Sequence, residues 1–328
     1  MRVLVVTAMY PSADRPTNGT FVKEQVESLR EAGVIVDVLA FGARGQGANY
    51  LKAVGALWRQ LRAQRYDVIH AHYGLVGFIA RLQLQCPVVV TYHGSDLYGR
   101  PTPDNKPTLK GTASRLISKL AGSLAAQRII VAPVLRPKLW PLDGVIIPMG
   151  VDLSLFKPAP REEARRQLGL PPDKRLVLFV AHPKNYIKRY DLAEAAVQLL
   201  RQALPDVELM AVYQAPHDTV PTFMNACDAL VLTSTYEASP CVIKEAMACN
   251  LPIVSVNVGD VAERIEGVQG CYLCERTPQD IAAKLRRVLE DSRRPDSRSK
   301  IAELSLQNVA RRVIGVYQAA LETRAAQA

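Results

Sequence analysis

Short apolar runs bounded by polar residues alternate with longer segments of helical periodicity along the first 150 residues of the chain. All-apolar runs of this kind are typical of strands buried on both faces of a parallel sheet. The longer segments, clearest at 21–32 and 50–64, have apolar residues three and four positions apart and are predicted to be helices. The runs predicted to be strands are 3–7, 34–41, 68–71, 88–92, 129–132 and 145–147.

The same alternation restarts after Gly150. Strands are predicted at 177–180, 208–212, 229–232, 252–256 and 270–273, with helices at 190–204, 242–248, 278–290 and finally near 305–324. Strands that alternate with helices form doubly wound parallel sheets, and 328 residues suit two domains of about 150 residues each. We therefore expect an α/β protein with two Rossmann-like domains.

The net charge of +10 is concentrated in the first half of the chain. Residues 1–152 hold 18 Lys and Arg against 10 Asp and Glu, whereas the remainder holds 23 against 21. Eight of the basic residues fall within 100–138, where Asp104 is the only acidic residue. A surface of this sign attracts anionic partners. Because no aromatic interleaving or nucleic-acid-binding motif accompanies the charge, nucleic acid is not the expected partner.

Helical spacing from 108 to 127 places two of these cations, Arg115 and Lys119, one turn apart. They lie beside an apolar stripe made of Leu116, Leu120 and Leu124. Two interpretations are open. The stripe faces the core and leaves a solvated basic edge, or the edge is attracted to an anionic membrane leaflet or a phosphorylated acceptor.

No apolar run approaches the roughly 18 residues that a transmembrane helix needs, and the N-terminal segment is predicted to be a strand followed by polar residues rather than a signal peptide. We therefore expect a cytoplasmic protein, for which the basic half allows a peripheral position on the inner face of the cell membrane.

The six cysteines of the chain are expected to be reduced and mostly buried. Cys271 and Cys274 have CxxC spacing, but no second pair or nearby histidine completes a zinc site, so this segment is predicted to be a strand.

Two carboxylates, Glu237 and Glu245, lie eight residues apart across the predicted turn from the strand at 229–232 into the helix at 242–248. Open α/β sheets bind anions and nucleotides where a strand ends and the backbone N–H groups of a helix N-terminus are free. A carboxylate accepts hydrogen bonds from neighbouring hydroxyls, so ribose and hexose diols are suitable ligands. The alternative is that both glutamates are solvated at a helix end.

This segment resembles the Glu-x7-Glu motif of retaining glycosyltransferases of the GT-B fold, specifically family 4, the glycosyl transferases group 1. Residues 147–152, Ile-Pro-Met-Gly-Val-Asp, resemble the interdomain signature of that family, with Met149 at the place of the usual Asn. Residues 245–254 are similar to the helix and strand after the motif, and 258–263 to the loop that follows. The resemblance covers essentially the whole chain and is strong in the C-terminal half. It is specific because four motifs agree in order, not because any one of them is decisive.

The resemblance implies a GT-B fold, in which two Rossmann-like domains face an interdomain cleft. It implies an acceptor-binding domain at 1–152, a nucleotide-sugar-binding domain at 153–310, and a C-terminal helix at 311–328 that crosses back to the first domain. In this family Glu237 would bind hydroxyls of the donor sugar and Glu245 the ribose. The donor-binding segment between them is Ala238, Ser239, Pro240, Cys241 and Val242.

The loop after the first strand contains Asn18-Gly19-Thr20. Gly19 permits close approach of the backbone, and Thr20 can cap the helix that follows. The loop lacks GxGxxG, which argues against a dinucleotide dehydrogenase. By resemblance, Gly19 and Thr20 face the pyrophosphate of the donor.

Two histidines, His72 and His93, are predicted at or near the ends of strands. Asp96 follows closely enough to influence the charge of His93. By resemblance, His93 lines the donor-sugar site. His72 is assigned to the acceptor side, together with Arg115 and Lys119.

The loop after the strand at 177–180 carries the cations that would hold the diphosphate. Family members have an Arg here and a Lys five or six residues later; Lys188 fits the Lys, whereas the Arg position falls at His182. Lys184 or Arg189 could supply the missing charge, although a Lys does not reproduce the fork of an Arg. A second departure lies between 212 and 228, where family members have a further helix and strand, so the nucleobase side is expected to be built differently.

We expect a retaining hexosyltransferase that moves a sugar from a UDP- or GDP-type nucleotide-diphosphate sugar to a glycan or lipid-linked acceptor in cell-envelope or polysaccharide biosynthesis. His93, Lys188 and Glu237 are the expected catalytic residues, with Lys188 stabilising charge on the leaving phosphate. Since the chain has no Asp-x-Asp, we expect no metal, and we expect no cofactor because the nucleotide-diphosphate sugar is the substrate. Two alternatives stay open: a catalytically impaired nucleotide-binding relative, because of His182, and a sugar-nucleotide epimerase of related fold.

Overall fold

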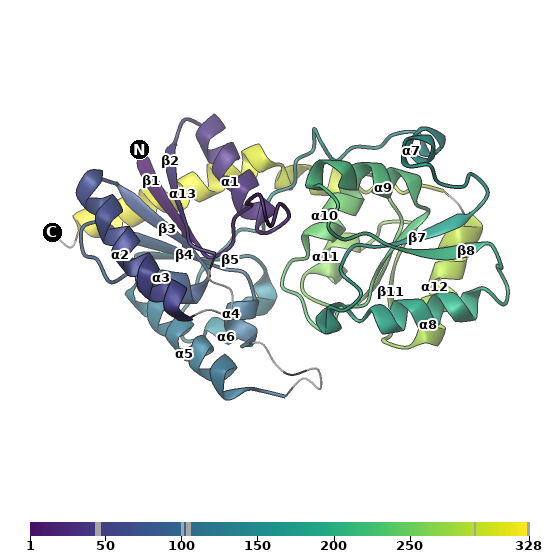
Figure 1. Ribbon diagram of the computed structural model, residues 1–328, viewed down its shortest axis with the longest axis horizontal. Coiled ribbons are helices and arrows are strands. Elements are labelled where there is room, and N and C mark those ends of the chain that lie inside the picture. The colour runs from purple at the N-terminus through teal and green to yellow at the C-terminus, as the bar shows by residue number, and fades with distance from the viewer. Residues whose placement is uncertain (43–46, 100–101, 103–105, 292, 327–328) are drawn as a thin grey trace. The chain divides into compact units, whose positions relative to one another are not determined.

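In the computed structural model, which describes residues 1–42, 47–99, 102, 106–291 and 293–326, the chain forms two compact units (Figure 1). Met1–Gly150 and Leu306–Ala328 make the first unit, and Val151–Ser305 makes the second. At the boundary, the N–H of Val151 donates to the carbonyl of Leu304 (2.9 Å). The boundaries between the units are thus 150/151 and 305/306 in the structure, whereas the sequence-based division places them at 152/153 and 310/311.

A six-stranded parallel sheet with the order β2-β1-β3-β4-β5-β6 forms the centre of the first unit. Because all its strands run in parallel, their carboxyl ends meet at one edge. The strands agree with the predicted apolar runs to within two residues at each end. They are β1 (Arg2–Thr7), β2 (Ile35–Ala40), β3 (Val68–His72), β4 (Val88–Tyr92), β5 (Gln127–Ile130) and β6 (Val145–Ile146).

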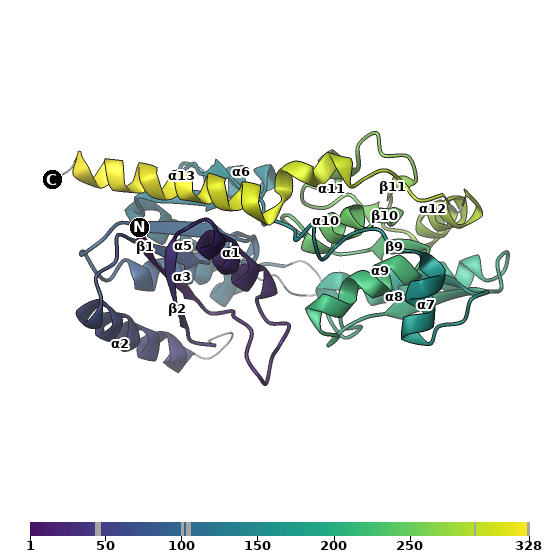
Figure 2. The same cartoon turned by 90° about the horizontal axis from the view of Figure 1, so that it is seen from above.

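Helices cover both faces of this sheet (Figure 2). On one face, α1 (Thr20–Glu31) packs against α13 (Leu306–Ala325), and α13 contacts β3, β4 and β5. On the other, α3 (Gly74–Ala80) packs against α2 (Gly47–Ala63) and α5 (Leu109–Leu124). Two short helices, α4 (Ser95–Tyr98) and α6 (Arg136–Leu139), and a 3-10 turn, η1 (Pro133–Leu135), complete the unit. The helix that ends the chain is thus part of the first core, where Val313 and Tyr317 are fully buried.

The second unit contains a five-stranded parallel sheet with the order β11-β10-β9-β7-β8. Its strands are β7 (Arg175–Phe179), β8 (Val207–Ala211), β9 (Ala229–Leu232), β10 (Ile253–Val256) and β11 (Cys271–Cys274). Its helices are α7 (Arg161–Leu168), α8 (Tyr190–Leu200), α9 (Val220–Ala226), α10 (Cys241–Ala248), α11 (Val261–Ile265) and α12 (Pro278–Asp291), with 3-10 turns η2 (Tyr186–Lys188), η3 (His217–Thr219) and η4 (Ser299–Leu304). α8 packs against α12 and buries Ala193, Val197 and Leu200, the one-sided spacing typical of a helix on a sheet.

The connection from β8 to β9 is short, as its sequence predicted. Only η3 and α9 lie between the two strands, so the further strand expected in family members is missing from this continuously described stretch. The CxxC segment is the strand β11, which is also as predicted, and both of its thiols are buried. Burial raises the pKa of the Cys271 thiol to about 11 and that of Cys274 to about 12, so both thiols stay protonated.

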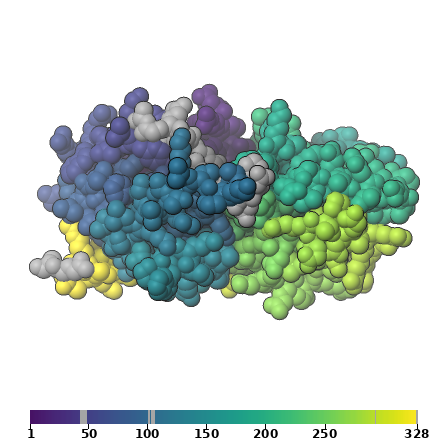
Figure 3. Space-filling view, turned by 90° about the horizontal axis from the view of Figure 1, so that it is seen from below, coloured from purple at the N-terminus to yellow at the C-terminus, as the bar shows by residue number. Residues whose placement is uncertain are grey.

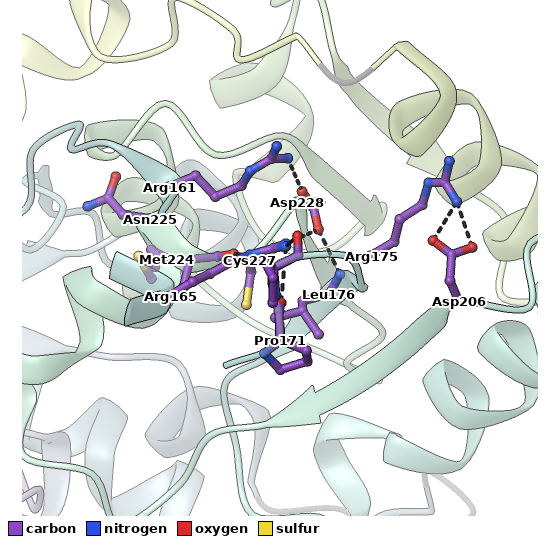
Figure 4. A network of polar contacts seen from close by, with 12 residues as sticks. Arg161, Arg165, Pro171, Arg175, Leu176, Asp206, Met224, Asn225, Cys227 and Asp228 are labelled. Carbon is purple, nitrogen blue, oxygen red and sulfur yellow. Dashed lines mark hydrogen bonds and ion pairs between the residues drawn. The ribbon is translucent and has the colours of Figure 1, made fainter. Parts of the chain in front are cut away.

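Asp228, just before β9, connects α7 to the amino-terminal edge of the second sheet (Figure 4). Its carboxylate accepts hydrogen bonds from Arg161 (2.7 Å), from Arg165 (2.8 Å) and from the N–H of Leu176 at the start of β7 (2.7 Å). Arg165 is 5% exposed and also donates to the carbonyl of Ala226 (2.9 Å). A buried guanidinium needs such partners, because an uncompensated charge is costly away from water.

The orientation of α5 corrects one of the two interpretations of its sequence. Leu116, Leu120 and Leu124 are exposed, at 61, 48 and 45%, so the stripe does not face the core. The buried side of α5 consists of Gly111, Ser118, Ala121 and Gly122. Periodicity located the stripe correctly, but it could not tell which side of the helix packs on the sheet. Arg100 and Asp104 of the basic segment lie outside the described residues.

Candidate functional site

The loop between β9 and α10 carries Glu237 at the carboxyl-terminal edge of the second sheet. Its backbone is held by the loop after β10, because the N–H of Asp260 donates to the carbonyl of Ala238 (3.0 Å). Gly259 makes this contact possible. Its φ is +61°, and a Cβ there would lie 2.3 Å from the Ala238 carbonyl oxygen. The loop matched by resemblance at 258–263 therefore supports the motif loop.

Lys188 and Glu237 form an ion pair at this edge. The Lys188 Nζ lies 2.5 Å from the Glu237 Oε1, and the two side chains are 25 and 17% exposed. The hydroxyl of Ser234 donates to the same carboxylate oxygen (2.8 Å). Two residues that the sequence assigned to the donor site thus lie together, although 49 positions separate them.

The loop that carries Lys188 is fixed to the end of β9. The hydroxyl of Thr233 donates to the carbonyls of Lys188 (2.8 Å) and Arg189 (2.9 Å), and the N–H of Thr235 donates to the carbonyl of Ile187 (2.7 Å). These bonds hold the backbone on which the Lys188 side chain is mounted. Preorganisation of this kind is what a charge-stabilising group needs.

Glu245 lies on α10 beside a histidine that the sequence did not single out. The Nε2 of His217 is 3.4 Å from the Glu245 Oε1, and the imidazole lies 5.3 Å from the Phe156 ring. His217 belongs to η3, in the shortened connection between β8 and β9. In the sequence, the short length of this connection was the only sign that the surroundings of Glu245 would be unusual.

The side chain of Ser239 hydrogen-bonds other residues of the protein. Its hydroxyl donates to the Asp260 carboxylate (2.9 Å) and accepts from the Nζ of Lys244 (3.2 Å). Asp260 also accepts from Arg264 (3.1 Å). Lys244 is 1% exposed, and its burial was not expected from its place between the two motif glutamates. A ligand at this loop would therefore meet the backbone of Ser239 rather than its hydroxyl.

No side chain in the described part of the chain caps the N-terminus of α10. Pro240 stands at the N-cap position and offers no side-chain acceptor, while Cys241 and Val242 begin the helix half-buried. Helix N-termini carry orphan N–H groups and the positive end of the helix dipole. The donor-binding segment predicted from the sequence thus supplies an N-terminus suited to an anion.

The two residues that could replace the missing Arg, Lys184 and Arg189, differ in what they contact. Arg189 forms a bidentate pair with Asp191 (Nε–Oδ1 2.9 Å, Nη2–Oδ2 2.7 Å), and this bond raises its pKa. Its charge is therefore already compensated. The ring of His182 lies 4.5 Å from that of Tyr213, and its Nδ1 accepts from the N–H of Lys184 (3.0 Å). Lys184 has an exposed side chain, which makes it the better second cation.

At the corresponding edge of the first unit, Gly19 rather than Thr20 is the N-cap of α1, so the prediction that Thr20 caps the helix is wrong. Gly19 has a φ of +75°, and a Cβ would lie 2.5 Å from the carbonyl oxygen of Met9. No side chain of the described residues caps α1. The close approach seen at Gly19 is to Met9, and the contact of Gly19 with the donor pyrophosphate stays a prediction.

His72 is a buried partner of His93. The Nδ1 of His72 lies 3.0 Å from the Nε2 of His93, and the two rings stack at 5.2 Å. His72 is fully buried, so it offers no surface to an acceptor, against its assigned role. Burial lowers its pKa to about 3, which keeps it neutral. Next to it, His70 hydrogen-bonds Tyr317 of α13 (2.7 Å).

The hydrogen bonding of His72 indicates which nitrogen carries its proton. Its Nε2 is buried and has no hydrogen-bond partner in the described part of the chain. An orphaned buried N–H is rarer than an orphaned acceptor, so we infer that the proton is on Nδ1 and is donated to His93. The Nε2 of His93 then accepts, and a neutral His93 has its own proton on Nδ1.

Asp96 is buried near His93, but it hydrogen-bonds backbone groups. Its carboxylate accepts from the N–H of Gly94 (2.9 Å) and from that of Gly74 (3.2 Å). Burial raises its pKa to about 6, and these N–H groups oppose the rise. Asp96 thus holds the turns after β3 and β4 together, and it also lines a pocket with Met9, Tyr73 and other residues of this edge.

Arg115 and Lys119 do not line that pocket. Arg115 is exposed on α5, and the Nζ of Lys119 donates to the carbonyl of Trp140 (3.0 Å). His72 is fully buried, and in the described part of the chain its hydrogen bond and ring contacts are to other histidines rather than to Arg115 or Lys119. In the described ranges, no group of three or more His, Cys, Asp or Glu side chains is placed to hold a metal ion. None of the helices described there is long and apolar enough to cross a membrane.

Two models of known families match most of this chain. Residues 1–139 match the model described as "Glycosyl transferase 4-like domain", and residues 189–291 match "Glycosyl transferases group 1". A curated relative, "Putative teichuronic acid biosynthesis glycosyltransferase TuaC" of Bacillus subtilis (strain 168), is 25% identical over 88% of this chain and 89% of its own length.

Solved structures agree with these matches in fold. Sucrose-phosphate synthase from Thermosynechococcus elongatus has a TM-score of 0.80 and 18% identity, over 97% of this chain and 98% of that one. HepE of Anabaena, in complex with UDP-glucose, has a TM-score of 0.65 and 21% identity, over 99% of this chain and 100% of that one. The expected GT-B fold is confirmed, and the fold and family matches together identify the chain as a GT-B glycosyltransferase of the group 1 type.

Proposed function

We propose that the protein is a retaining glycosyltransferase whose second unit binds a nucleotide-diphosphate sugar. The observation that carries the proposal is the placement of Lys188, Glu237 and Glu245 around the loop from β9 to α10. A nucleotide-diphosphate sugar presents a diphosphate, a ribose diol and sugar hydroxyls. A cation, an uncapped helix N-terminus and two carboxylates match these groups. The solved complex of HepE with UDP-glucose supports a donor of this class.

Lys188 is the proposed stabiliser of the leaving diphosphate, since negative charge develops there as the glycosidic bond breaks. When phosphate oxygens contact Lys188, Glu237 retains the hydroxyl of Ser234 and can accept from a hydroxyl of the sugar. Lys184 is the proposed second cation in place of the Arg that His182 replaces, because Arg189 is paired with Asp191. The chemistry then needs no metal ion.

Glu245 is the proposed ribose ligand, and His217 fixes the orientation of its carboxylate. The proposed role of the first unit is acceptor binding, and His93 stays a predicted contact of the donor sugar on the resemblance alone. A glycan or lipid-linked acceptor in cell-envelope biosynthesis is proposed because the relative TuaC is named for teichuronic acid biosynthesis. The donor base, UDP or GDP, is left to experiment.

The test is turnover of sugar nucleotides in EDTA, followed by proton NMR. We expect release of nucleoside diphosphate from one UDP- or GDP-sugar, slow with water as acceptor, with the first sugar anomer keeping the configuration of the donor. Lys188→Ala serves as the control and should abolish the release. Release of the opposite anomer would reject retention.

The same experiment separates the alternatives. Conversion of the donor into an epimeric sugar nucleotide, with no nucleoside diphosphate released, would indicate an epimerase. Nucleotide binding without turnover of any donor, even with added glycan acceptors, would indicate a catalytically impaired relative, with His182 as the first residue to replace by Arg.

A further inference from the structure

Helix α5 packs with its small residues inward. Cβ atoms added on the inner side would collide with the first unit, since one on Gly111 would lie 1.6 Å from the Gly99 carbonyl oxygen and one on Gly122 2.4 Å from the Tyr92 hydroxyl. The helix therefore approaches its unit so closely that large side chains cannot fit beneath it. Its leucines have to point away from the core.

The outward side of α5 forms a continuous apolar stripe. Its residues are Leu109, Leu116, Ile117, Leu120 and Leu124, exposed by 92, 61, 36, 48 and 45%; with Trp140, which is 72% exposed, we define them as the α5 face. Their spacing of three, four and seven positions places them on one side of a helix. The backbone of Trp140 is held near α5, because its carbonyl accepts from the Nζ of Lys119. The segment that carries α5, blue in Figure 3, forms part of the molecular surface.

Single exposed leucines are ordinary on protein surfaces, but a row of them marks an interaction site. The usual amphipathic helix of a soluble protein buries its apolar side, and here that side is presented to solvent. Tryptophan, like tyrosine, is enriched at the boundary between water and lipid.

Positive charge borders the α5 face on both sides. From Lys106 to Lys138 the sequence contains seven Lys and Arg and no acidic residue. At 100° per residue, Lys110 falls at one border of the stripe, Lys119 falls near the other, and Arg115 lies further round the helix on that second side. Beyond Leu124 a groove continues the surface, and its lining includes Arg81, Arg128 and Arg324.

We propose that the α5 face docks on an anionic lipid bilayer. The leucines and Trp140 would enter the boundary between headgroups and acyl chains, and the bordering cations would contact lipid phosphates, as in interfacial amphipathic helices. The charge decides between possible occupants. A second copy of this chain would bring the same cations against one another, whereas an anionic leaflet complements them on both sides of the stripe.

Binding of the full-length chain to vesicles tests the proposal without any turnover of sugar, so its outcome is independent of the proposed function. We expect flotation with vesicles of equal parts phosphatidylcholine and phosphatidylglycerol at about 50 mM salt. Partition should fall at least tenfold with phosphatidylcholine alone, and again at about 500 mM salt. Each of Lys110→Gln and Arg115→Gln should weaken partition about fivefold.

The apolar contribution needs its own variants. Leu116→Ser with Leu120→Ser should lower partition at least tenfold while the thermal midpoint is kept. Leu51→Ser is the matched control, because Leu51 is 77% exposed on α2 and lies outside the α5 face. In a Trp58→Phe background, the fluorescence of Trp140 should shift to the blue when vesicles are added, since the indole leaves water.

Three results would overturn the proposal. Failure of the wild-type chain to bind the anionic vesicles is the first. Equal partition of the double serine variant and Leu51→Ser is the second. The third is a dimer in analytical ultracentrifugation that only the double serine variant dissociates, with no blue shift of Trp140, which would make the occupant a second copy of the chain.

Discussion

The ammonium of Lys188 contacts the carboxylate of Glu237 at 2.5 Å, between the loop after β7 and the loop after β9. Both side chains are mostly buried, and the backbone around each is tied to the other loop through Thr233 and Thr235. The pair therefore sets the spacing of a cation and an anion before any ligand arrives. In the proposed function, the cation meets the diphosphate and the anion meets the sugar.

Opposite effects are expected when either partner of this pair is changed. Lys188→Ala should weaken nucleoside diphosphate binding by about 1.5–3 kcal/mol, the range for a hydrogen bond to a charged group. Glu237→Gln should leave that affinity nearly unchanged or raise it, because Lys188 loses a competing partner, while turnover of the sugar nucleotide falls. Calorimetry gives the affinities and nucleoside diphosphate release gives the turnover. If Glu237→Gln weakened the diphosphate as strongly as Lys188→Ala, the separate roles would be wrong.

The ribose role of Glu245 can be isolated by removing one hydroxyl of the ligand. The wild-type protein should bind the ribonucleoside diphosphate about 1–3 kcal/mol more tightly than its 2′-deoxy analogue, and Glu245→Ala should abolish most of this preference. His217→Ala should reduce the preference only in part, because it removes the group that orients the carboxylate. A preference that survives unchanged in Glu245→Ala would place the ribose elsewhere.

The buried imidazole of His72 should make stability depend on pH. Its pKa is about 3 in the folded protein, and an unfolded His titrates near 6.5, so the unfolded state binds more protons between these values. The stability that neutral His72 maintains above about pH 6.5 is thus lost as the pH falls toward 3. His72→Asn keeps a donor towards His93 without titrating.

The free energy of unfolding of the wild type, relative to His72→Asn, should fall by about 2 kcal/mol between about pH 7.5 and 5. Urea denaturation should be used to measure the difference in unfolding free energy between the wild type and His72→Asn. Asp96, whose pKa is raised to about 6, changes stability with pH in the opposite direction to His72. Because both proteins contain Asp96, its contribution cancels in the difference. His182→Asn, at an exposed histidine, is the control. A pH-independent difference would mean that His72 is protonated in the folded state.

Asp228 is expected to be important for the stability of the second unit. Asp228→Asn leaves Arg165 buried without a counter-charge and should lower the free energy of unfolding by about 3–5 kcal/mol. Asp206→Asn is the matched control. It breaks the Arg175 pair, whose side chains are 38 and 33% exposed, and should cost about 1 kcal/mol or less. Equal losses in urea denaturation would show that burial does not decide the difference.

The strands and the donor edge were predictable because their signals are local. Short, mostly apolar runs located the strands of the described residues, and the carboxyl ends of parallel strands brought Lys188 near Glu237. The contact of His217 with Glu245 was not predictable, since it depends on how a shortened connection crosses the end of the sheet.

Two further outcomes in the first unit also have physical causes. Thr20 has the side chain of a helix cap, but Gly19 takes that position because only glycine fits against Met9. In α5, a stripe of leucines has the same periodicity whether it faces the core or solvent. The orientation is decided by the close packing of Gly111 and Gly122, which a hydrophobicity pattern does not record.

Isothermal titration of the full chain with UDP and GDP in EDTA tests the central claim most directly, with wild type, Lys188→Ala and Glu245→Ala compared side by side. We predict one site for one of the two nucleotides in the wild type. Binding should be weakened at least about tenfold in Lys188→Ala, which loses a contact of about 1.5–3 kcal/mol, and at least about fivefold in Glu245→Ala, which loses about 1–3 kcal/mol. Binding of equal strength in all three proteins, or no binding of either nucleotide to the wild type, would contradict the assignment of the donor site to the edge around Lys188 and Glu237.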